Sequence, residues 1–124
     1  MLLDGFMVNL LIIVNDAPYG TEKAWNALRL ANACCSSSIN MYVRVFLMGD
    51  SVAVAKKGQN LPEGYYNLEK MLTDLVTKGV DVKACGTCMN ARGITDLELV
   101  ECVQRGTMMI LANWIQESDR TISF

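Results

Sequence analysis

The chain has 124 residues, of which 52% are hydrophobic and 19% charged, and this composition fits one folded domain over residues 1–124 better than a disordered segment. The net charge of −2 leaves no basic excess for neutralising phosphates, so direct nucleic-acid binding is not expected. The chain has no histidine, which excludes a Ser-His-Asp triad, a Cys-His dyad and any His-ligated metal site.

The cysteine count and the start of the chain predict a cytoplasmic protein. An odd number of cysteines favours a reducing compartment over a secreted disulfide framework. No Lys or Arg precedes Lys23, as a signal peptide would require, and no apolar run approaches the roughly 20 residues that cross a bilayer. We therefore expect no membrane association. The five cysteines are Cys34, Cys35, Cys85, Cys88 and Cys102.

The first half of the chain alternates predicted strands and helices. Its continuous apolar runs are typical of strands buried on both faces of a parallel sheet. The expected elements are a strand over Phe6–Val14, a helix that Thr21 caps and Ser36–Ser38 ends, a strand over Met41–Met48 and a short helix over Ser51–Lys57.

The second half continues the alternation. Apolar residues at helical spacing predict an amphipathic helix over Tyr65–Lys78, and Val80–Cys85 follows as a strand. Val100–Gln104 fits either a short strand or the end of a helix that begins near Thr95. Thr107 then caps a helix over Met108–Gln116, and Thr121–Phe124 forms a last strand. The pattern predicts an α/β fold with a mainly parallel sheet of four or five strands and helices on both faces.

The candidate site lies where the predicted strands end. Ligands of open α/β sheets bind beyond the carboxyl ends of the strands, so the turns there should share one edge. Glycines at positions 49 and 86 would let other groups approach the backbone closely. Asp16 and Asp50 fit a ligand site and simple turn capping equally well. The three turns are Asn15-Asp16, Gly49-Asp50 and Cys85-Gly86-Thr87-Cys88.

The Cys85-x-x-Cys88 pair is the sharpest chemical signal. A thiol at a strand end that leads into a helix N-terminus can have a lowered pKa, and Arg92 could add positive charge, so we expect Cys85 to be the most reactive thiol. The alternative is two inert, buried cysteines. Lys57, beside Lys56, could attract an anionic sulfur species or simply be solvated. A single CxxC motif falls short of a zinc site, so we expect neither metal nor other cofactor.

Several segments together resemble the DsrE/DsrF-like family, in particular its small stand-alone YchN-type branch. The resemblance runs roughly from Leu11 to Phe124, and its most specific part is the stretch around Cys85. The matching segments are IIVNDAPYGTEKAWNALRLA, VRVFLMGD, KKGQ, PEGYYNLEKML and GVDVKACGTCMNARG.

The resemblance implies a three-layer α/β/α sandwich, a homotrimer or homohexamer, and a role in sulfur relay as a carrier or sulfurtransferase. Related members carry sulfane sulfur as a persulfide on a cysteine seven residues before an Arg-Gly pair, a position that Cys85 occupies relative to Arg92. Cys88 belongs to the CxxC-bearing branch and would resolve or protect the persulfide. Asn90 stands where the family commonly has Asp.

Three functions remain open from the residues. A sulfur-relay protein would take sulfane sulfur from a donor protein onto Cys85 and pass it to an acceptor protein. A dithiol oxidoreductase would instead cycle Cys85 and Cys88 through a disulfide. In a non-catalytic oligomeric binding protein the cysteines would only pack, and slow alkylation of Cys85 would favour that reading. For all three we expect a homo-oligomer, because Met108–Ile115 is apolar on too many sides for a helix packed on one sheet.

Overall fold

The computed structural model describes residues 7–124, so Phe6, the first residue of the predicted first strand, lies outside the described residues. Its sheet has five strands in the order β4-β3-β2-β1-β5, and every pairing is parallel. This confirms the predicted parallel sheet. The strands are β1 (Asn9–Val14), β2 (Tyr42–Leu47), β3 (Asp81–Cys85), β4 (Gln104–Gly106) and β5 (Arg120–Ser123).

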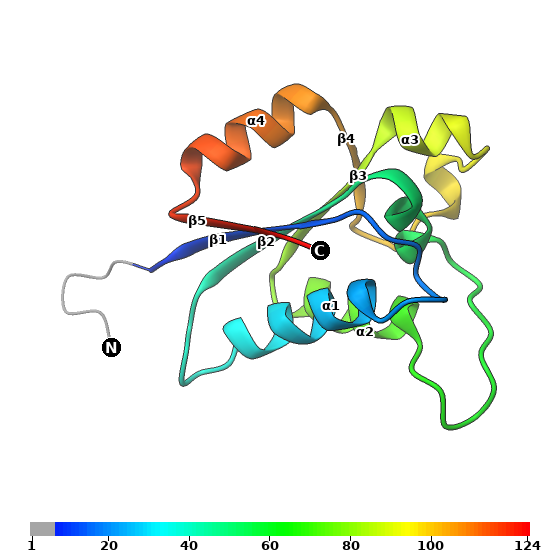
Figure 1. Cartoon of the computed structure of the whole chain (residues 1–124), viewed down its shortest axis with the longest axis horizontal. Helices are drawn as coiled ribbons and strands as arrows, with labels where there is room; N and C mark the ends of the chain where they lie inside the picture. The colour runs from blue at the N-terminus through cyan, green and yellow to red at the C-terminus, as the bar shows by residue number, and fades with distance from the viewer. Residues whose placement is uncertain (1–6) are drawn as a thin grey trace.

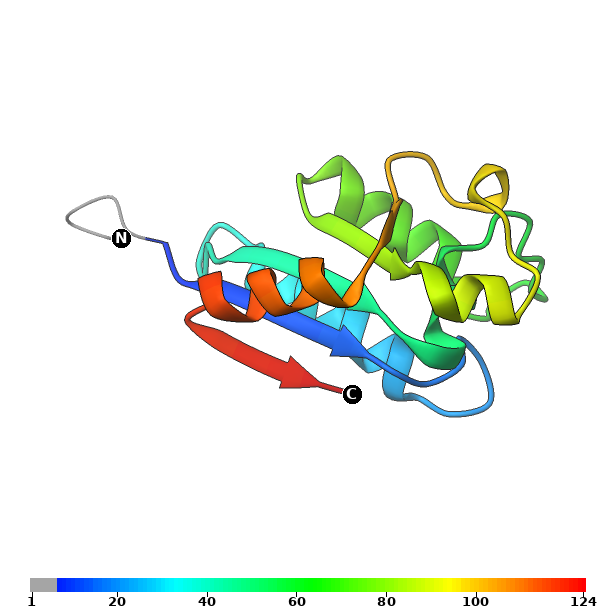
Figure 2. The same ribbon diagram turned by 90° about the horizontal axis from the view of Figure 1, so that it is seen from above.

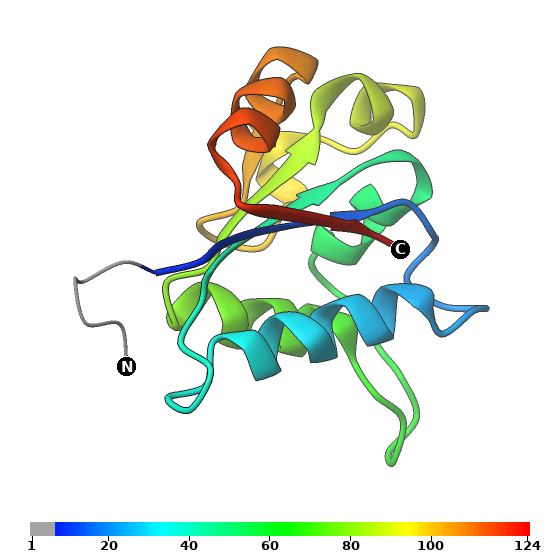
Figure 3. The ribbon, with the colours of Figure 1, turned by 60° about the vertical axis from the view of Figure 1, so that its left-hand side comes forward.

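Helices cover both faces of this sheet and confirm the three-layer α/β/α sandwich (Figure 1). Helices α1 (Lys23–Cys34) and α2 (Leu68–Thr77) lie side by side on one face, while α3 (Gly86–Ala91) and α4 (Met108–Glu117) lie on the other (Figure 3). Two short 3₁₀ helices, η1 (Gly49–Ala55) and η2 (Asp96–Glu98), complete the fold. Among residues 7–124, no helix has the length and apolar character needed to cross a bilayer.

The core explains why the central strands are apolar on both faces. β1 is fully buried at Leu11 and Ile12, whose side chains point to opposite sides of the sheet. Small residues on the buried face of α1, such as Ala27, let that helix lie close to the sheet. On the other face Phe46 meets Trp114 of α4 edge to face, with ring centroids 6.1 Å apart. Both layers of helix are therefore fixed to the sheet by apolar contact.

Helices α1 and α2 begin at residues that differ from the predicted ones. Thr21 is not the N-cap of α1, because Glu22 occupies that position; the Thr21 hydroxyl donates to Asp16 at 2.9 Å and accepts the Lys23 N–H at 3.4 Å. α2 begins at Leu68 rather than Tyr65, because Asn67 Oδ1 accepts the Lys70 N–H at 3.1 Å and so forms the N-cap. Tyr65 lies in the turn before α2, where its N–H donates to Pro62 O at 3.1 Å, and its side chain is exposed.

The ambiguous segment before α4 contains a strand, but only its last residue belongs to it. β4 starts at Gln104, and the residues before it pack against η1, where the Val100 N–H donates to Ala55 O at 2.7 Å. Thr107 caps α4 as predicted, since its Oγ1 accepts the Ile110 N–H at 3.2 Å. β3 and β4 then pair so that Cys85 lies beside Gly106.

Candidate functional site

The predicted turns do meet at one edge of the sheet, because all strands are parallel (Figure 2). The buried Ser51 Oγ lies 2.5 Å from Val14 O and 2.7 Å from Met48 O, which ties the ends of β1 and β2 together. Asp50 Oδ1 accepts from Arg92 Nη2 at 2.7 Å, which joins the turn after β2 to the end of α3. The edge is therefore a connected structure around the cysteine motif.

Cys85 and Cys88 lie in different environments at this edge. Cys85 ends β3, serves as the N-cap residue of α3, and is only 4% exposed. Cys88 lies in the first turn of α3 and is half-buried. Both line a surface pocket of about 520 Å³ between α3 and the start of α4. Its other lining residues are Gly86, Thr87, Asn90, Arg105, Gly106, Thr107 and Met108.

The Cys85 thiol has a raised pKa, which corrects the expected lowering. Burial is the largest cause, because it disfavours the charged thiolate. The backbone N–H groups of Cys88 and Thr87 lie near enough to favour the thiolate, as expected at a helix start, but burial outweighs them. The neighbouring Cys88 thiol raises the pKa further. Arg92 plays no part, since its guanidinium donates to Asp50 and to Cys88 O.

Arg105 is the pocket residue that sequence reasoning missed. Its Nη1 donates to Gly86 O at 2.9 Å and to Asn90 Oδ1 at 3.0 Å, and its Nε donates to Asp96 Oδ1 at 2.8 Å. A Cβ on Gly86 would stand 2.8 Å from Arg105 Cγ, so the glycine does permit a close approach, here by a side chain. Arg105 thus fastens α3, which carries Cys88 and begins directly after Cys85, to β4.

The signal for Arg105 was present but incomplete. Arg105 lies in β4, a strand of only three residues. The pairing of Cys85 with Gly106 brings Arg105 next to the cysteine motif. Had β4 been recognised as ending at Gly106, the rule that placed the other strand ends would have placed Arg105 at the same edge. Asn90, noted for departing from the family pattern, accepts from this arginine.

Of the seven predicted supporting residues, Gly86 and Thr87 line the pocket, and the other five do not: Asn15, Asp16, Asp50, Lys57 and Arg92. Asp16 accepts from Thr21 and serves the turn after β1. Asn15 Nδ2 donates to Phe124 O at 3.0 Å, at the end of β5. Lys57 is exposed, and its backbone N–H donates to Glu98 O at 2.8 Å. These side chains belong to the edge but not to the cysteine pocket.

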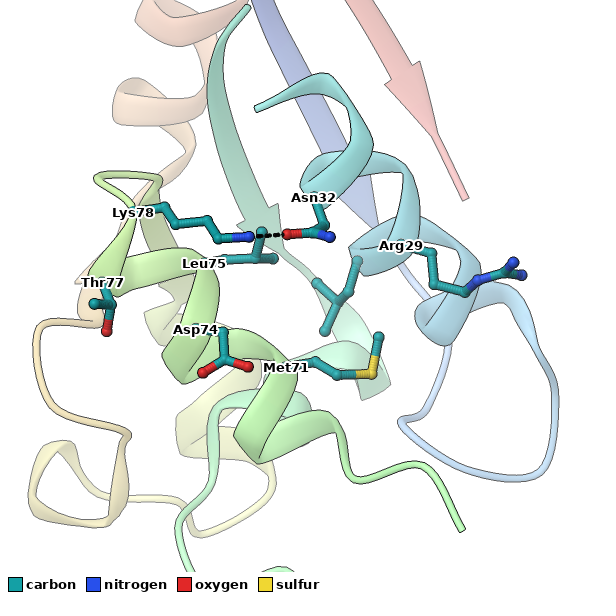
Figure 4. Close-up of a pocket in the computed structure, with 8 residues that line it drawn as sticks. Arg29, Asn32, Met71, Asp74, Leu75, Thr77 and Lys78 are labelled. Atoms are coloured by element: carbon teal, nitrogen blue, oxygen red, sulfur yellow. Dashed lines mark hydrogen bonds between the residues drawn. The ribbon is translucent and has the colours of Figure 1, made fainter. Parts of the chain in front are cut away.

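A second pocket, of about 460 Å³, lies between α1 and α2 on the far face of the sheet. Lys78 donates to Asn32 across it, and Asp74 and Arg29 lie on its rim (Figure 4). Leu75 and Met71 form its apolar floor, and no cysteine lines it. In the part of the chain that the structure describes, no three Cys, Asp or Glu side chains gather as a metal site would require. Of these two pockets, only the one at the carboxyl edge of the sheet is lined by cysteines, Cys85 and Cys88.

Fold and site together define a class of small α/β proteins with a pair of thiols at the carboxyl edge of a parallel sheet. The DsrE/DsrF-like family model matches residues 8–124, and the chain belongs to that family. The chain is 42% identical to protein YchN from Escherichia coli strain K12 over 118 residues, which cover 95% of this chain and 100% of YchN. It is also 40% identical over 113 residues to protein MK0008 from Methanopyrus kandleri, with 91% of each chain covered.

Solved structures agree with this assignment. The crystal structure of the ychN protein from E. coli matches with a TM-score of 0.89 and covers 95% of this chain and 100% of that one. MTH1491 from Methanobacterium thermoautotrophicum matches with a TM-score of 0.74 at 14% identity, covering 96% of this chain and 100% of its own. At that identity the likeness shows the shared fold alone.

Proposed function

We propose that this protein is a sulfur-relay carrier that holds sulfane sulfur as a persulfide on Cys85. Membership of the DsrE/DsrF-like family supports a role of the sulfur-relay type. The observation that carries the proposal is the pair of thiols, Cys85 and Cys88, that line one open pocket at the carboxyl edge of the sheet. Thiols are the groups that accept and release sulfane sulfur.

The surroundings of Cys85 suit storage of a reactive sulfur. A persulfide there would be shielded from bulk thiols, because the residue is buried among strand and helix. Among residues 7–124, Arg105 is the one charged residue that lines the pocket, and no carboxylate of these residues lines it. The Asp96 carboxylate pairs with this guanidinium at 2.8 Å and offsets part of its positive charge.

A dithiol oxidoreductase is the second candidate, because the thiols of Cys85 and Cys88 line the same pocket. Such an enzyme would form an internal disulfide after attacking a substrate disulfide. The burial and raised pKa of Cys85, taken alone, would favour a non-catalytic binding protein. Cys88, however, is only half-buried and offers an accessible thiol. A non-catalytic binding protein has no need of such a thiol, so its presence favours thiol chemistry.

The proposal includes sulfur donor and acceptor proteins, a reducing cytoplasm that keeps the thiols free, and a homo-oligomer, either a trimer or a hexamer. The oligomer is supported by the outer face of α4, where Met109 is 70% exposed, Met108 53% and Ile115 46%. Apolar side chains gathered on one exposed helix face are typical of an interface.

The test is to incubate the reduced protein with polysulfide and compare intact masses with and without reductant. We expect wild type and Cys88→Ser to gain one reducible sulfur, and the double variant Cys85→Ser/Cys88→Ser to gain none. Cys102→Ser is the matched control, because Cys102 is exposed and lies outside the pocket, and it should load like wild type. Equal loading of the double variant would overturn the proposal. Failure of wild type to load, with ready reduction of protein disulfides, would favour the oxidoreductase.

A further inference from the structure

The two cysteines of the pocket differ in how a sulfur donor can reach them. Cys85 is 4% exposed, whereas Cys88 is half-buried and sits one turn further along α3. A thiol attacks sulfur along the axis of the bond that breaks, so the attacking atom must be reachable by the donor. The donor therefore meets Cys88 before Cys85.

We propose that Cys88 is the entry thiol, which accepts sulfane sulfur from the donor and hands it to Cys85. This inference rests on the proposed function, since it assigns an order to the two thiols within the same relay. It differs from a resolving role for Cys88, in which that thiol acts only after Cys85 has been loaded.

The transfer balances without an outside oxidant or reductant. The Cys88 thiolate attacks the outer sulfur of a donor persulfide, R–S–SH, whose S–S bond breaks, so that R–S⁻ leaves and Cys88–S–SH forms. The Cys85 thiolate then attacks the outer sulfur of Cys88–S–SH, and the Cys88 sulfur leaves as a thiolate. The proton lost by Cys85 passes to Cys88. Each step breaks one S–S bond and forms another.

The surroundings of Cys85 support its place as the second acceptor. Both side chains line the same pocket, one helical turn apart, so the outer sulfur of a Cys88 persulfide would form close to the Cys85 sulfur. Burial raises the pKa of the Cys85 thiol, and a thiolate of higher pKa is intrinsically the stronger nucleophile. The nearby N–H groups of Thr87 and Cys88 favour the anionic form of that sulfur once the proton has left.

A competing step would end the relay. If Cys85 attacked the inner sulfur of Cys88–S–SH, a Cys85–Cys88 disulfide would form and HS⁻ would leave. That step is also balanced, and it produces sulfide in place of a loaded carrier. The time course of loading tells the two outcomes apart.

The experiment mixes reduced protein with glutathione persulfide, quenches with iodoacetamide at successive times, and locates the added sulfur by tandem mass spectrometry. In wild type we expect label on Cys88 first and then on Cys85. Cys85→Ser should load at the wild-type rate and keep its sulfur on Cys88. Cys88→Ser should load Cys85 at least about tenfold more slowly, because the donor must reach a buried thiol. Cys102→Ser is the control and should match wild type.

Label that appears first on Cys85, or loading of Cys88→Ser at the wild-type rate, would overturn the entry role and leave the carrier proposal standing. Absence of retained sulfur on both pocket cysteines in wild type would overturn the carrier proposal itself. The order of labelling in wild type needs no variant, so it decides the question even if a substitution impairs folding.

Discussion

Replacing Gly86 by Ala probes the contact that holds α3 in place. A Cβ there would stand 2.8 Å from Arg105 Cγ, 2.9 Å from Nη1 and 3.0 Å from Cδ, so the arginine stem must move by roughly half an ångström to reach ordinary contact. That movement disturbs the bonds from Arg105 to Gly86 O, Asn90 and Asp96.

The expected magnitude follows from two opposed effects. Each disturbed hydrogen bond is worth about 0.5–1.5 kcal/mol, and the exposed ion pair with Asp96 contributes less than about 1 kcal/mol. Alanine at a helical position offsets this by up to about 1 kcal/mol. We therefore expect Gly86→Ala to lower the free energy of unfolding by about 1–2 kcal/mol. In an Arg105→Ala background the clash is gone, and the same change should be neutral or stabilising.

The assay is a double-mutant cycle from urea unfolding at fixed protein concentration with reductant, followed by tryptophan fluorescence. Asp96→Asn serves as the control, because it removes the exposed ion pair without introducing a clash, and it should cost less than about 1 kcal/mol. If Gly86→Ala costs the same with and without Arg105, then Arg105 does not fasten α3 and the reasoning fails.

Four other expectations follow from the same structure. Gly106→Ala should cost about 1–3 kcal/mol in unfolding free energy, because its Cβ would stand 2.8 Å from the buried Phe46 ring; an unchanged urea midpoint would contradict this. The midpoint pH for alkylation of Cys85 should lie above about 8.5 and stay unchanged in Arg92→Gln, whereas a downward-shifted midpoint would show that burial does not dominate. Because burial raises the folded-state pKa of this thiol, its contribution to stability is complete below about pH 8.5 and is lost as the pH rises through the folded value. Light scattering at micromolar concentration should give a multiple of the 13.7 kDa chain, and a monomer mass would refute the interface proposed on α4.

The three-layer α/β/α arrangement and the position of the site at the carboxyl edge of the sheet could be predicted from the sequence, because both depend on local patterns. Apolar runs such as that ending at Val14 require burial on both sides, which makes the sheet parallel and covered by helices. Strand ends in a parallel sheet share an edge, which placed the turn that contains Asp50 near the cysteine motif, although the ion pair of Asp50 with Arg92 was not predicted. The cysteine motif could be located in the same way.

Burial and long-range partners could not be predicted in this manner. The exposure of Cys85 depends on how η1, α3 and α4 close around it, and no local pattern encodes that packing. The role of Arg105 depends on pairing between β3 and a strand of three residues, which is too short to show a period. Lys57 was considered because it lies at the end of the helix expected after β2. Its position in the sequence did not bring it to the pocket.

The central claim is that sulfane sulfur comes to rest on Cys85. Its most direct test is tandem mass spectrometry of wild-type protein equilibrated with polysulfide, alkylated and cleaved after Lys83 and Arg92. The resulting peptide contains both Cys85 and Cys88, so fragment ions assign the added sulfur to one of them. The account predicts one added sulfur on Cys85 that reductant removes. Sulfur that stays on Cys88 or Cys102, with Cys85 unmodified, would contradict it.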